Sequence, residues 1–218
     1  FLQLYQQRGV DVNLRTVGSG TAVRETLATL GLEKTEKAVL LAARYPGIRL
    51  LLLRRSYPEL RENHILPLKE ELNGLAVWRE TDKVFAFANG SRIVFGHCAG
   101  EHDVDQYQGQ EYDIIFIDEA TQFTEYQFSA LTACLRGANR FPKRMYLTCN
   151  PGGVGHMWVK RLFVDRAFRA GEEAEDYVFI QAKASDNPAL VENAYASTQS
   201  EDKAFRPSTP EGIEAPAR

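Results

Sequence analysis

The stretch Ile114-Ile115-Phe116-Ile117-Asp118-Glu119-Ala120 decides how this 218-residue chain is interpreted. Its four consecutive apolar residues are too few for a helix and are typical of a strand buried on both faces of a parallel sheet. Such a strand delivers the residues after it to the carboxyl end of the sheet, where open α/β folds bind ligands. We therefore expect Asp118 and Glu119 to lie at a ligand site. The alternative is an ordinary strand that ends in two solvated acids.

Two further apolar runs predict strands that accompany this one. The first covers residues 49–54, and the second covers residues 144–149 and continues into Asn150-Pro151. Because a proline disfavours the helical conformation in the residue before it, this strand ends at Asn150. If the strands are parallel, Thr148 and Asn150 reach the same edge of the sheet as Asp118. An ordinary strand-to-loop turn is the alternative for that pair.

The remaining patterns predict helices that alternate with strands, which indicates an α/β domain with a mainly parallel sheet. Asn89-Gly90 between two apolar runs predicts a hairpin with a type I′ turn, in which both central residues have positive φ. Thr124 and Gln127 form a capping box before an amphipathic helix. The other expected elements are a strand at 10–17, helices at 21–30 and 33–44, a polar helix with a turn at Pro67, hairpin strands at 83–88 and 91–95, helices at 124–136 and 156–169, and a strand at 177–180.

The composition is ordinary for a soluble globular protein, with 44% hydrophobic and 25% charged residues. No apolar run approaches the ~18 residues that a membrane span needs, and the first residues do not resemble a signal peptide. Three scattered cysteines favour a reducing compartment over a disulfide framework. The spacing of His97, Cys98 and His102 matches no standard zinc site.

Charge is segregated along the chain, although the net charge is only −3. Eight acids and no Lys or Arg lie between Glu101 and Glu125, whereas eight Lys or Arg and one acid lie between Arg136 and Arg169. A basic face binds the phosphates of a nucleic acid even when the whole chain is slightly acidic. Chance clustering, or pairing of these charges across the fold, is the alternative.

Together these motifs resemble the large terminase subunit of tailed bacteriophages, the ATP-driven motor that packages DNA into proheads. The matching segments follow the family's order from about Glu36 to Leu190. They are Tyr45-Pro46-Gly47-Ile48-Arg49, Leu53-Arg54-Arg55-Ser56-Tyr57-Pro58-Glu59-Leu60, Asn89-Gly90-Ser91-Arg92, Gln106-Tyr107-Gln108-Gly109, residues 116–124 and residues 147–156.

The resemblance implies roles for four residues. Asp118 and Glu119 become the Walker B pair, in which Asp118 holds Mg²⁺ and Glu119 is the general base toward the water that attacks ATP. Thr148 and Asn150 belong to the motif that couples hydrolysis to DNA movement, and they lie near the nucleotide. The implied fold is P-loop NTPase-like, of the RecA type, with helices on both faces of a mainly parallel sheet and an inserted β-hairpin.

The chain departs from the family at the Walker A loop. That loop is a glycine-rich turn ending in Gly-Lys-Ser/Thr, whose backbone N–H groups cradle the phosphates. The sequence contains no such turn, because Gly18-Ser19-Gly20-Thr21 lacks the lysine and Glu33-Lys34-Thr35 has a glutamate where a glycine is needed. Lys34 and Thr35 are the preferred substitutes for nucleotide binding, and ordinary helix-surface residues are the alternative.

The resemblance also implies partners: double-stranded DNA, the portal protein, the terminase small subunit and further copies of the chain in a ring. The work would take place in the bacterial host cytoplasm, without a membrane. Basic residues near the first and third strands are candidates for DNA phosphate contacts, and one of them is a candidate arginine finger toward a neighbouring subunit. The candidates are Arg54, Arg55, Arg136, Arg140, Lys143, Arg144, Lys160 and Arg161.

We expect a divergent segment at 1–35, an ATPase domain at 36–190 and a disordered, proline-rich tail at 191–218. This organisation has no RNase H-like nuclease, so no DNA cleavage is expected. The leading hypothesis is a packaging motor. A catalytically inactive prophage remnant, able only to bind DNA or a packaging partner, is favoured by the missing Walker A loop. A helicase-like ATPase is the third hypothesis, and the run from Asn150 to His156 argues against it.

Overall fold

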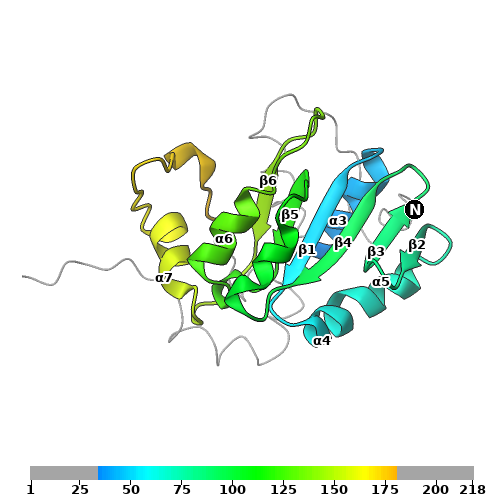
Figure 1. Ribbon diagram of the computed structural model, residues 1–218, viewed down its shortest axis with the longest axis horizontal. Helices are drawn as coiled ribbons and strands as arrows, with labels where there is room; N and C mark the ends of the chain where they lie inside the picture. Colours follow the sequence, from blue (N-terminus) through cyan, green and yellow to red (C-terminus); the bar gives the residue numbers. More distant parts are fainter. Residues whose placement is uncertain (1–33, 181–218) are drawn as a thin grey trace, which may run out of the picture. The chain divides into compact units, whose positions relative to one another are not determined.

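The computed structural model describes residues 34–180, which belong to two compact units divided after Asn150. The described part of the first unit is built on one sheet with the strand order β2-β3-β4-β1-β5-β6 (Figure 1). Strands β4, β1, β5 and β6 are parallel, and β2, β3 and β4 are antiparallel neighbours. The predicted α/β class with a mainly parallel sheet and an inserted hairpin is confirmed. The strands are β1 (Arg49–Arg54), β2 (Ala76–Arg79), β3 (Val84–Phe87), β4 (Arg92–His97), β5 (Ile114–Ile117) and β6 (Arg144–Leu147).

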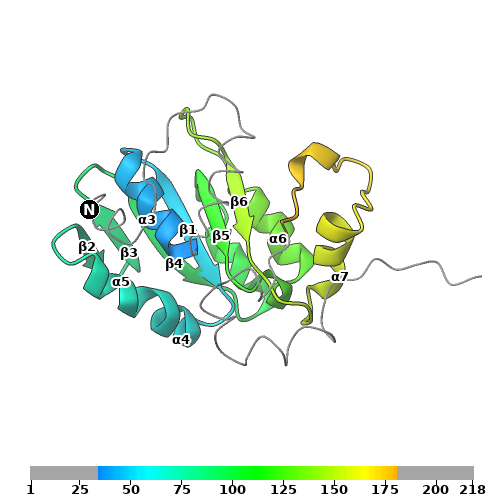
Figure 2. The ribbon, with the colours of Figure 1, turned by 180° about the vertical axis from the view of Figure 1, so that it is seen from behind.

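Helices cover both faces of this sheet. Figures 1 and 2 show α3 (Lys34–Arg44) on one face and α6 (Glu125–Thr132) on the other. No helix within residues 34–180 is long and apolar enough to cross a membrane. The other helical segments of the first unit are α4 (Tyr57–Leu60), η1 (Arg61–Ile65), α5 (Leu66–Glu71), η2 (Glu101–Tyr107) and η3 (Ala120–Gln122), and those of the second are α7 (His156–Val159), η4 (Lys160–Val164) and η5 (Ala174–Asp176).

Strand β1 occupies the middle of the parallel part of the sheet, which explains its unbroken apolar run. The four leucines from Leu50 to Leu53 are completely buried, and Leu50 and Leu52 belong to the core cluster that includes α3. In the parallel register Leu50 is level with Ile114 and Leu53 with Ile117. The residues that follow β1 and β5 therefore emerge side by side at the same edge of the sheet.

The helical segment after β1 continues through Pro67 instead of turning there. The five residues of η1 form a π-helical turn just before the proline, in which the Leu66 N–H bonds to the Arg61 carbonyl five residues back. A proline has no N–H and its ring clashes with the carbonyl four residues earlier, so a local widening lets the helix pass it. The same turn places His64 and Ile65 in buried positions.

The predicted hairpin between β3 and β4 is confirmed, but its turn type is different. Asn89 has no positive φ, whereas Gly90 has φ of 84°. The Gly90 N–H bonds to the Phe87 carbonyl, and the Phe87 N–H bonds to the Ser91 carbonyl. The loop is thus three residues long, a form in which a single glycine supplies the left-handed position. Asn89 Nδ2 also donates to the Ala42 and Ala43 carbonyls and so caps the end of α3.

The capping box before α6 is confirmed, but the helix ends at Thr132 and not at the predicted Arg136. The Tyr112 N–H bonds to the Cys134 carbonyl, so the backbone beyond Thr132 pairs with the segment before β5 instead of continuing the helix. Strand β2 was not expected from the sequence. It pairs with β3 along its whole length.

Two predictions in the second unit are wrong. The helix that begins at His156 ends at Val164 and not at 169, because Arg166 adopts the left-handed conformation with φ of 53°. Residues 177–180 form no strand within the described part of the chain; the Tyr177 ring packs instead against Phe163 and Phe168. The elements predicted at 10–17 and 21–30, and the tail at 191–218, lie outside the described residues.

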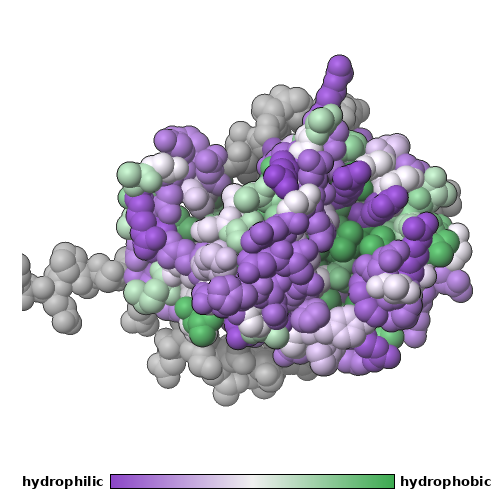
Figure 3. Space-filling model, in the orientation of Figure 1, coloured by the Kyte–Doolittle hydropathy of each residue, from purple (hydrophilic) through white to green (hydrophobic). Residues whose placement is uncertain are grey.

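The acidic run between Glu101 and Glu125 lies on the α6 side of the sheet. Figure 3 views this side, and hydrophilic side chains gather over η2 and α6 while an apolar area lies over β3 and β4. The carboxylates of Glu101, Asp105 and Glu111 belong to exposed residues. Part of the run is therefore a solvated acidic surface, whereas Asp113 and Asp118 of the same run are buried.

Gly96 in β4 leaves space for the Tyr107 ring, through which η2 packs against the sheet. A Cβ atom at this position would lie 2.0 Å from the Tyr107 hydroxyl and 2.8 Å from the adjacent ring carbon. We predict that Gly96→Ala lowers the free energy of unfolding by about 1–3 kcal/mol, the usual cost of overpacking. Urea unfolding of the two proteins measures it. Gly74→Ala tests the cost of backbone strain instead, since space is open around Gly74 but its φ is 77°. Equal stability of Gly96→Ala and the original chain would contradict the steric argument.

Candidate active site

The Asp118 carboxylate is the centre of a buried polar network at the carboxyl edge of the sheet. Its Oδ2 atom accepts from Arg54 Nη1 at 2.7 Å and from His64 Nε2 at 2.9 Å. Its Oδ1 atom accepts from Thr148 Oγ1 at 3.1 Å. Asp118 is only 4% exposed, and a buried carboxylate requires such partners because an unpaired one is very costly.

This network extends to the first turn of α3. His64 Nδ1 lies 2.8 Å from Thr35 Oγ1, so one imidazole joins the Thr35 hydroxyl to the Asp118 carboxylate. The three residues come from α3, from the π-helical turn and from the end of β5. A buried imidazole needs a partner at each ring nitrogen, and both are satisfied here.

Glu119 is held in a separate arrangement beside Asp118. Its backbone adopts the left-handed conformation, with φ and ψ both 55°, which is uncommon for a residue with a Cβ atom and is concentrated at functional sites. Its carboxylate accepts from Asn150 Nδ2 at 3.2 Å and from the Asn150 N–H at 3.4 Å. Glu119 is half-buried and Asn150 is exposed, so this carboxylate lies nearer to solvent than that of Asp118.

Backbone contacts keep the two strand ends together. The Ala120 N–H bonds to the Thr148 carbonyl, and Thr121 Oγ1 donates to the Asn150 carbonyl at 2.9 Å. Arg55 Nη1 donates to the Gln122 carbonyl at 2.6 Å and ties the end of β1 to the same loop. Asp118, Glu119, Thr148 and Asn150 are thus brought to one edge of the sheet, as the parallel order of the strands predicts.

Of the two predicted Walker A substitutes, Lys34 and Thr35, the structure describes the side-chain contacts of Thr35 only. Lys34 is the first residue of α3, and its side chain is not described. Thr35 reaches the Asp118 network through His64. Sequence reasoning did not identify His64, since a single histidine in a polar helix carries no local signal of its contacts. It also assigned Arg54 to DNA, whereas the structure pairs it with Asp118 and with Glu59 at 3.2 Å.

Mg²⁺ prefers carboxylate and hydroxyl oxygens and keeps several of its waters. The Asp118 carboxylate and the Thr148 hydroxyl supply such oxygens, whereas the Thr35 hydroxyl lies on the far side of the His64 ring. Within residues 34–180, no group of three or more His, Cys, Asp and Glu residues is placed to hold a metal ion. A hydrated cation bound by one carboxylate fits this composition better than an ion in a protein cage.

Most of the basic residues predicted to contact DNA make contacts within the chain. In the second unit, Arg161 forms two hydrogen bonds to Glu172, and these, with the Arg169 N–H, lower the pKa of Glu172 to about 2. Arg136 and Arg140 are exposed. Arg144 is half-buried, and its Nη1 atom has no hydrogen-bond partner within the described residues. The residues with internal partners are Arg54, Arg55, Lys143, Lys160 and Arg161.

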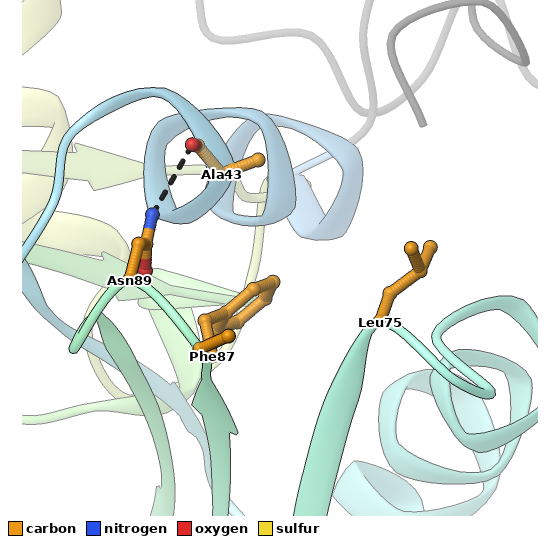
Figure 4. Close-up of a pocket in the computed structure, with 5 residues that line it drawn as sticks. Ala43, Leu75, Phe87 and Asn89 are labelled. Atoms are coloured by element: carbon orange, nitrogen blue, oxygen red, sulfur yellow. Dashed lines mark hydrogen bonds between the residues drawn. The ribbon is translucent and has the colours of Figure 1, made fainter.

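A small pocket lies at the other end of α3 from Thr35 and is separate from this network. Its volume is about 190 Å³, and its lining includes Ala43, Leu75, Phe87 and Asn89. Figure 4 shows the Asn89 amide directed at the Ala43 carbonyl, with Phe87 and Leu75 on either side of open space. No titratable side chain lines it, so the Asp118 network is the better candidate for chemistry.

Comparisons with known proteins identify the family and the fold. A family model described as phage terminase large subunit matches residues 31–206. No curated protein matches the chain. The large terminase of a thermophilic bacteriophage superimposes with a TM-score of 0.54 at 20% identity over 70% of this chain and 37% of the other. Its complex with ADP gives 0.55 at 19% identity, over 71% and 37% of the two chains. This likeness shows the fold, and the chain spans little more than a third of the length of that terminase.

Proposed function

The chain belongs to the phage terminase large-subunit family, and we propose that it is the ATPase motor part of such a subunit, coupling ATP hydrolysis to the movement of double-stranded DNA into the prohead. The observation that carries this proposal is the meeting of Asp118, Glu119, Thr148 and Asn150 at the carboxyl edge of a P-loop NTPase-like sheet. That edge is where ligands bind in open α/β folds. The large terminase of the thermophilic bacteriophage has been crystallised with ADP and with ATP-γ-S, which supports a nucleotide as the ligand.

In the proposed mechanism Glu119 is the general base. It takes a proton from the water that attacks the terminal phosphate, and Asn150 holds its carboxylate in place beforehand. Because Asn150 also accepts from Thr121 and directly precedes the second unit, a change at Glu119 is transmitted to the strand end that leads out of the sheet. Thr148, at the end of the coupling strand, links that strand to the acid after β5 through its hydrogen bond to Asp118.

Asp118, with the hydroxyl of Thr148 nearby, would hold the Mg²⁺ ion that accompanies ATP. When bound, this ion would neutralise phosphate charge and so favour the displacement. Lys34 and Thr35 remain our proposal for the substitute of the Walker A loop. Their support is that α3 begins at Lys34 and that Thr35 belongs to the Asp118 network.

The finer assignments are also proposals. We place the ATPase domain at residues 36–190, without nuclease activity, and expect it to act in the host cytoplasm with DNA, the portal protein, the small subunit and further copies in a ring. Arg136 and Arg140 are the best supported of the predicted DNA contacts, because both are exposed. Five of the other side chains already have partners within the chain, and the Nη1 atom of Arg144 is buried. Sequence-independent binding to phosphates is the role Arg136 and Arg140 would have.

Calorimetric titration with Mg-ATP tests the proposal directly. We expect the purified chain to bind Mg-ATP with a dissociation constant below the millimolar range and Asp118→Asn to bind it much more weakly, because the substitution removes the charge that favours the bound cation. Asp82→Asn is the matched control, because it makes the same change at an exposed acid in the turn between β2 and β3. No binding at millimolar ATP would reject the motor function and leave the inactive remnant as the better hypothesis.

A further inference from the structure

His64 is a buried polar residue on a helical segment whose other buried residues are apolar. The core-facing residues of this helix are Leu60, Ile65, Leu68 and Leu72, and each of them is at most 2% exposed. Leu60 and Ile65 are five residues apart, which is the spacing of the π-helical turn. An uninterrupted α-helix, with a spacing of four, would have placed His64 in the core instead of Ile65. Its side chain is 8% exposed and occupies a buried position beside the Asp118 carboxylate.

The Asp118 carboxylate fixes the direction of one of the two hydrogen bonds of His64. An ionised carboxylate only accepts, so His64 Nε2 donates its proton to Asp118 Oδ2. In the neutral ring Nδ1 is then the acceptor, and it takes the hydrogen bond of the Thr35 hydroxyl. A chain of two hydrogen bonds therefore runs from α3 through one ring to the acid after β5, across 29 and 54 residues of sequence.

Arg54 does not make this contact redundant. Arg54 brings positive charge to the same oxygen, but it reaches Asp118 on a long side chain that is also shared with Glu59. The imidazole is a rigid ring held at both nitrogens, so it restrains the rotation of the carboxylate together with Thr148 on Oδ1. Groups that orient a metal-binding side chain in this way typically contribute about 10–100-fold to metal affinity.

We propose that His64 is a positioning residue that sets the Asp118 carboxylate for cation binding and couples it to the Thr35 hydroxyl. This inference rests on the proposed function only in taking Asp118 as the residue that holds the cation. It predicts that Thr35 influences the affinity at Asp118 through His64 and by no other route. A histidine that merely filled space would show neither the directional requirement nor the coupling.

A double-mutant cycle on the full chain, with Mn²⁺ alone as the probe and no nucleotide, tests this. Electron paramagnetic resonance of free Mn²⁺ measures the dissociation constant. We expect His64→Leu to weaken binding at least ~10-fold. His64→Gln, which keeps a donor toward Asp118, should recover most of the loss. Thr35→Val should weaken binding in the original chain, and Thr35→Val with His64→Leu should be no weaker than His64→Leu alone.

The controls separate this inference from the proposed function. Asp118→Asn must abolish the Mn²⁺ site, and His102→Leu, at an exposed histidine on η2, must leave it unchanged. If His64→Leu binds Mn²⁺ as the original chain does, or if Thr35→Val has the same effect with and without His64, the inference is wrong whatever ATP does. If the Mn²⁺ results hold while Mg-ATP does not bind, the motor function alone fails. Should His64→Leu not fold, the glutamine and valine variants decide.

Discussion

ATP hydrolysis by Glu119→Gln is expected to fall at least ~100-fold below that of the original chain, because a positioned general base typically contributes about 10²–10⁴ in rate. Glutamine keeps the size of the side chain and can still contact Asn150, whose amide and N–H both reach Glu119 in the structure. It cannot take a proton. Binding of Mg-ATP should therefore persist, and phosphate release under saturating ATP is the measurement.

The matched control is Glu70→Gln, an exposed acid on α5. It removes the same charge from the same chain and should leave hydrolysis unchanged. Equal phosphate release by Glu119→Gln and Glu70→Gln would contradict the assignment of Glu119. A loss of ATP binding in Glu119→Gln would instead indicate a role in holding the nucleotide.

Asp113→Ala is expected to destabilise the fold strongly without touching the site. Asp113 precedes β5 at the opposite end from Asp118 and is almost completely buried. Its Oδ1 atom accepts from Lys143 Nζ at 2.7 Å, and its Oδ2 atom accepts from the Arg49 N–H at 2.9 Å. Alanine leaves a partly buried ammonium and a backbone N–H without this acceptor, at a cost of about 2–4 kcal/mol, less than for a fully buried pair because Lys143 is 22% exposed.

Urea unfolding measures this cost, and Asp82→Ala, at an exposed acid in the β2–β3 turn, should change stability by less than about 0.5 kcal/mol. Asp113→Asn should fall between the two, since its amide oxygen still accepts from Arg49. A loss below about 1 kcal/mol for Asp113→Ala would show that Lys143 finds equivalent partners. Asn139 and the Phe141 carbonyl, which already contact its ammonium, are the candidates.

The sequence was most informative where local pattern and position in the sheet coincide. The apolar runs before Arg54, Asp118 and Thr148 are short, so they predict strands, and parallel strands must deliver their next residues to a common edge. The contacts of Asp118 with Thr148 and of Glu119 with Asn150 follow from that geometry. The capping box at Thr124 could also be predicted, because its two residues are only three positions apart in the sequence.

The failures share a dependence on distant residues. The end of α6 is set by the bond from Tyr112 to Cys134, and the end of the helix after His156 by the left-handed Arg166, whose guanidinium donates to the Tyr177 carbonyl. The apolar run at 177–180 has strand composition, but composition alone does not provide a neighbouring strand. His64 and Arg54 acquire their roles only when segments 54 and 64 residues apart come together.

The π-helical turn before Pro67 has a consequence for the rotational phase of its helix. An α-helix turns about 100° per residue, so one residue accommodated in a widened turn shifts every later side chain around the axis by roughly that angle. This shift lets Ile65, Leu68 and Leu72 continue the apolar stripe begun by Leu60 while His64 is delivered to the acid at the sheet edge. Deleting one residue within Arg61–Asn63 would restore a regular α-helix and return the stripe to an unbroken period. It would also rotate the imidazole about the helix axis relative to Leu60. The π-helical turn that accommodates Pro67 therefore also positions His64 beside Asp118.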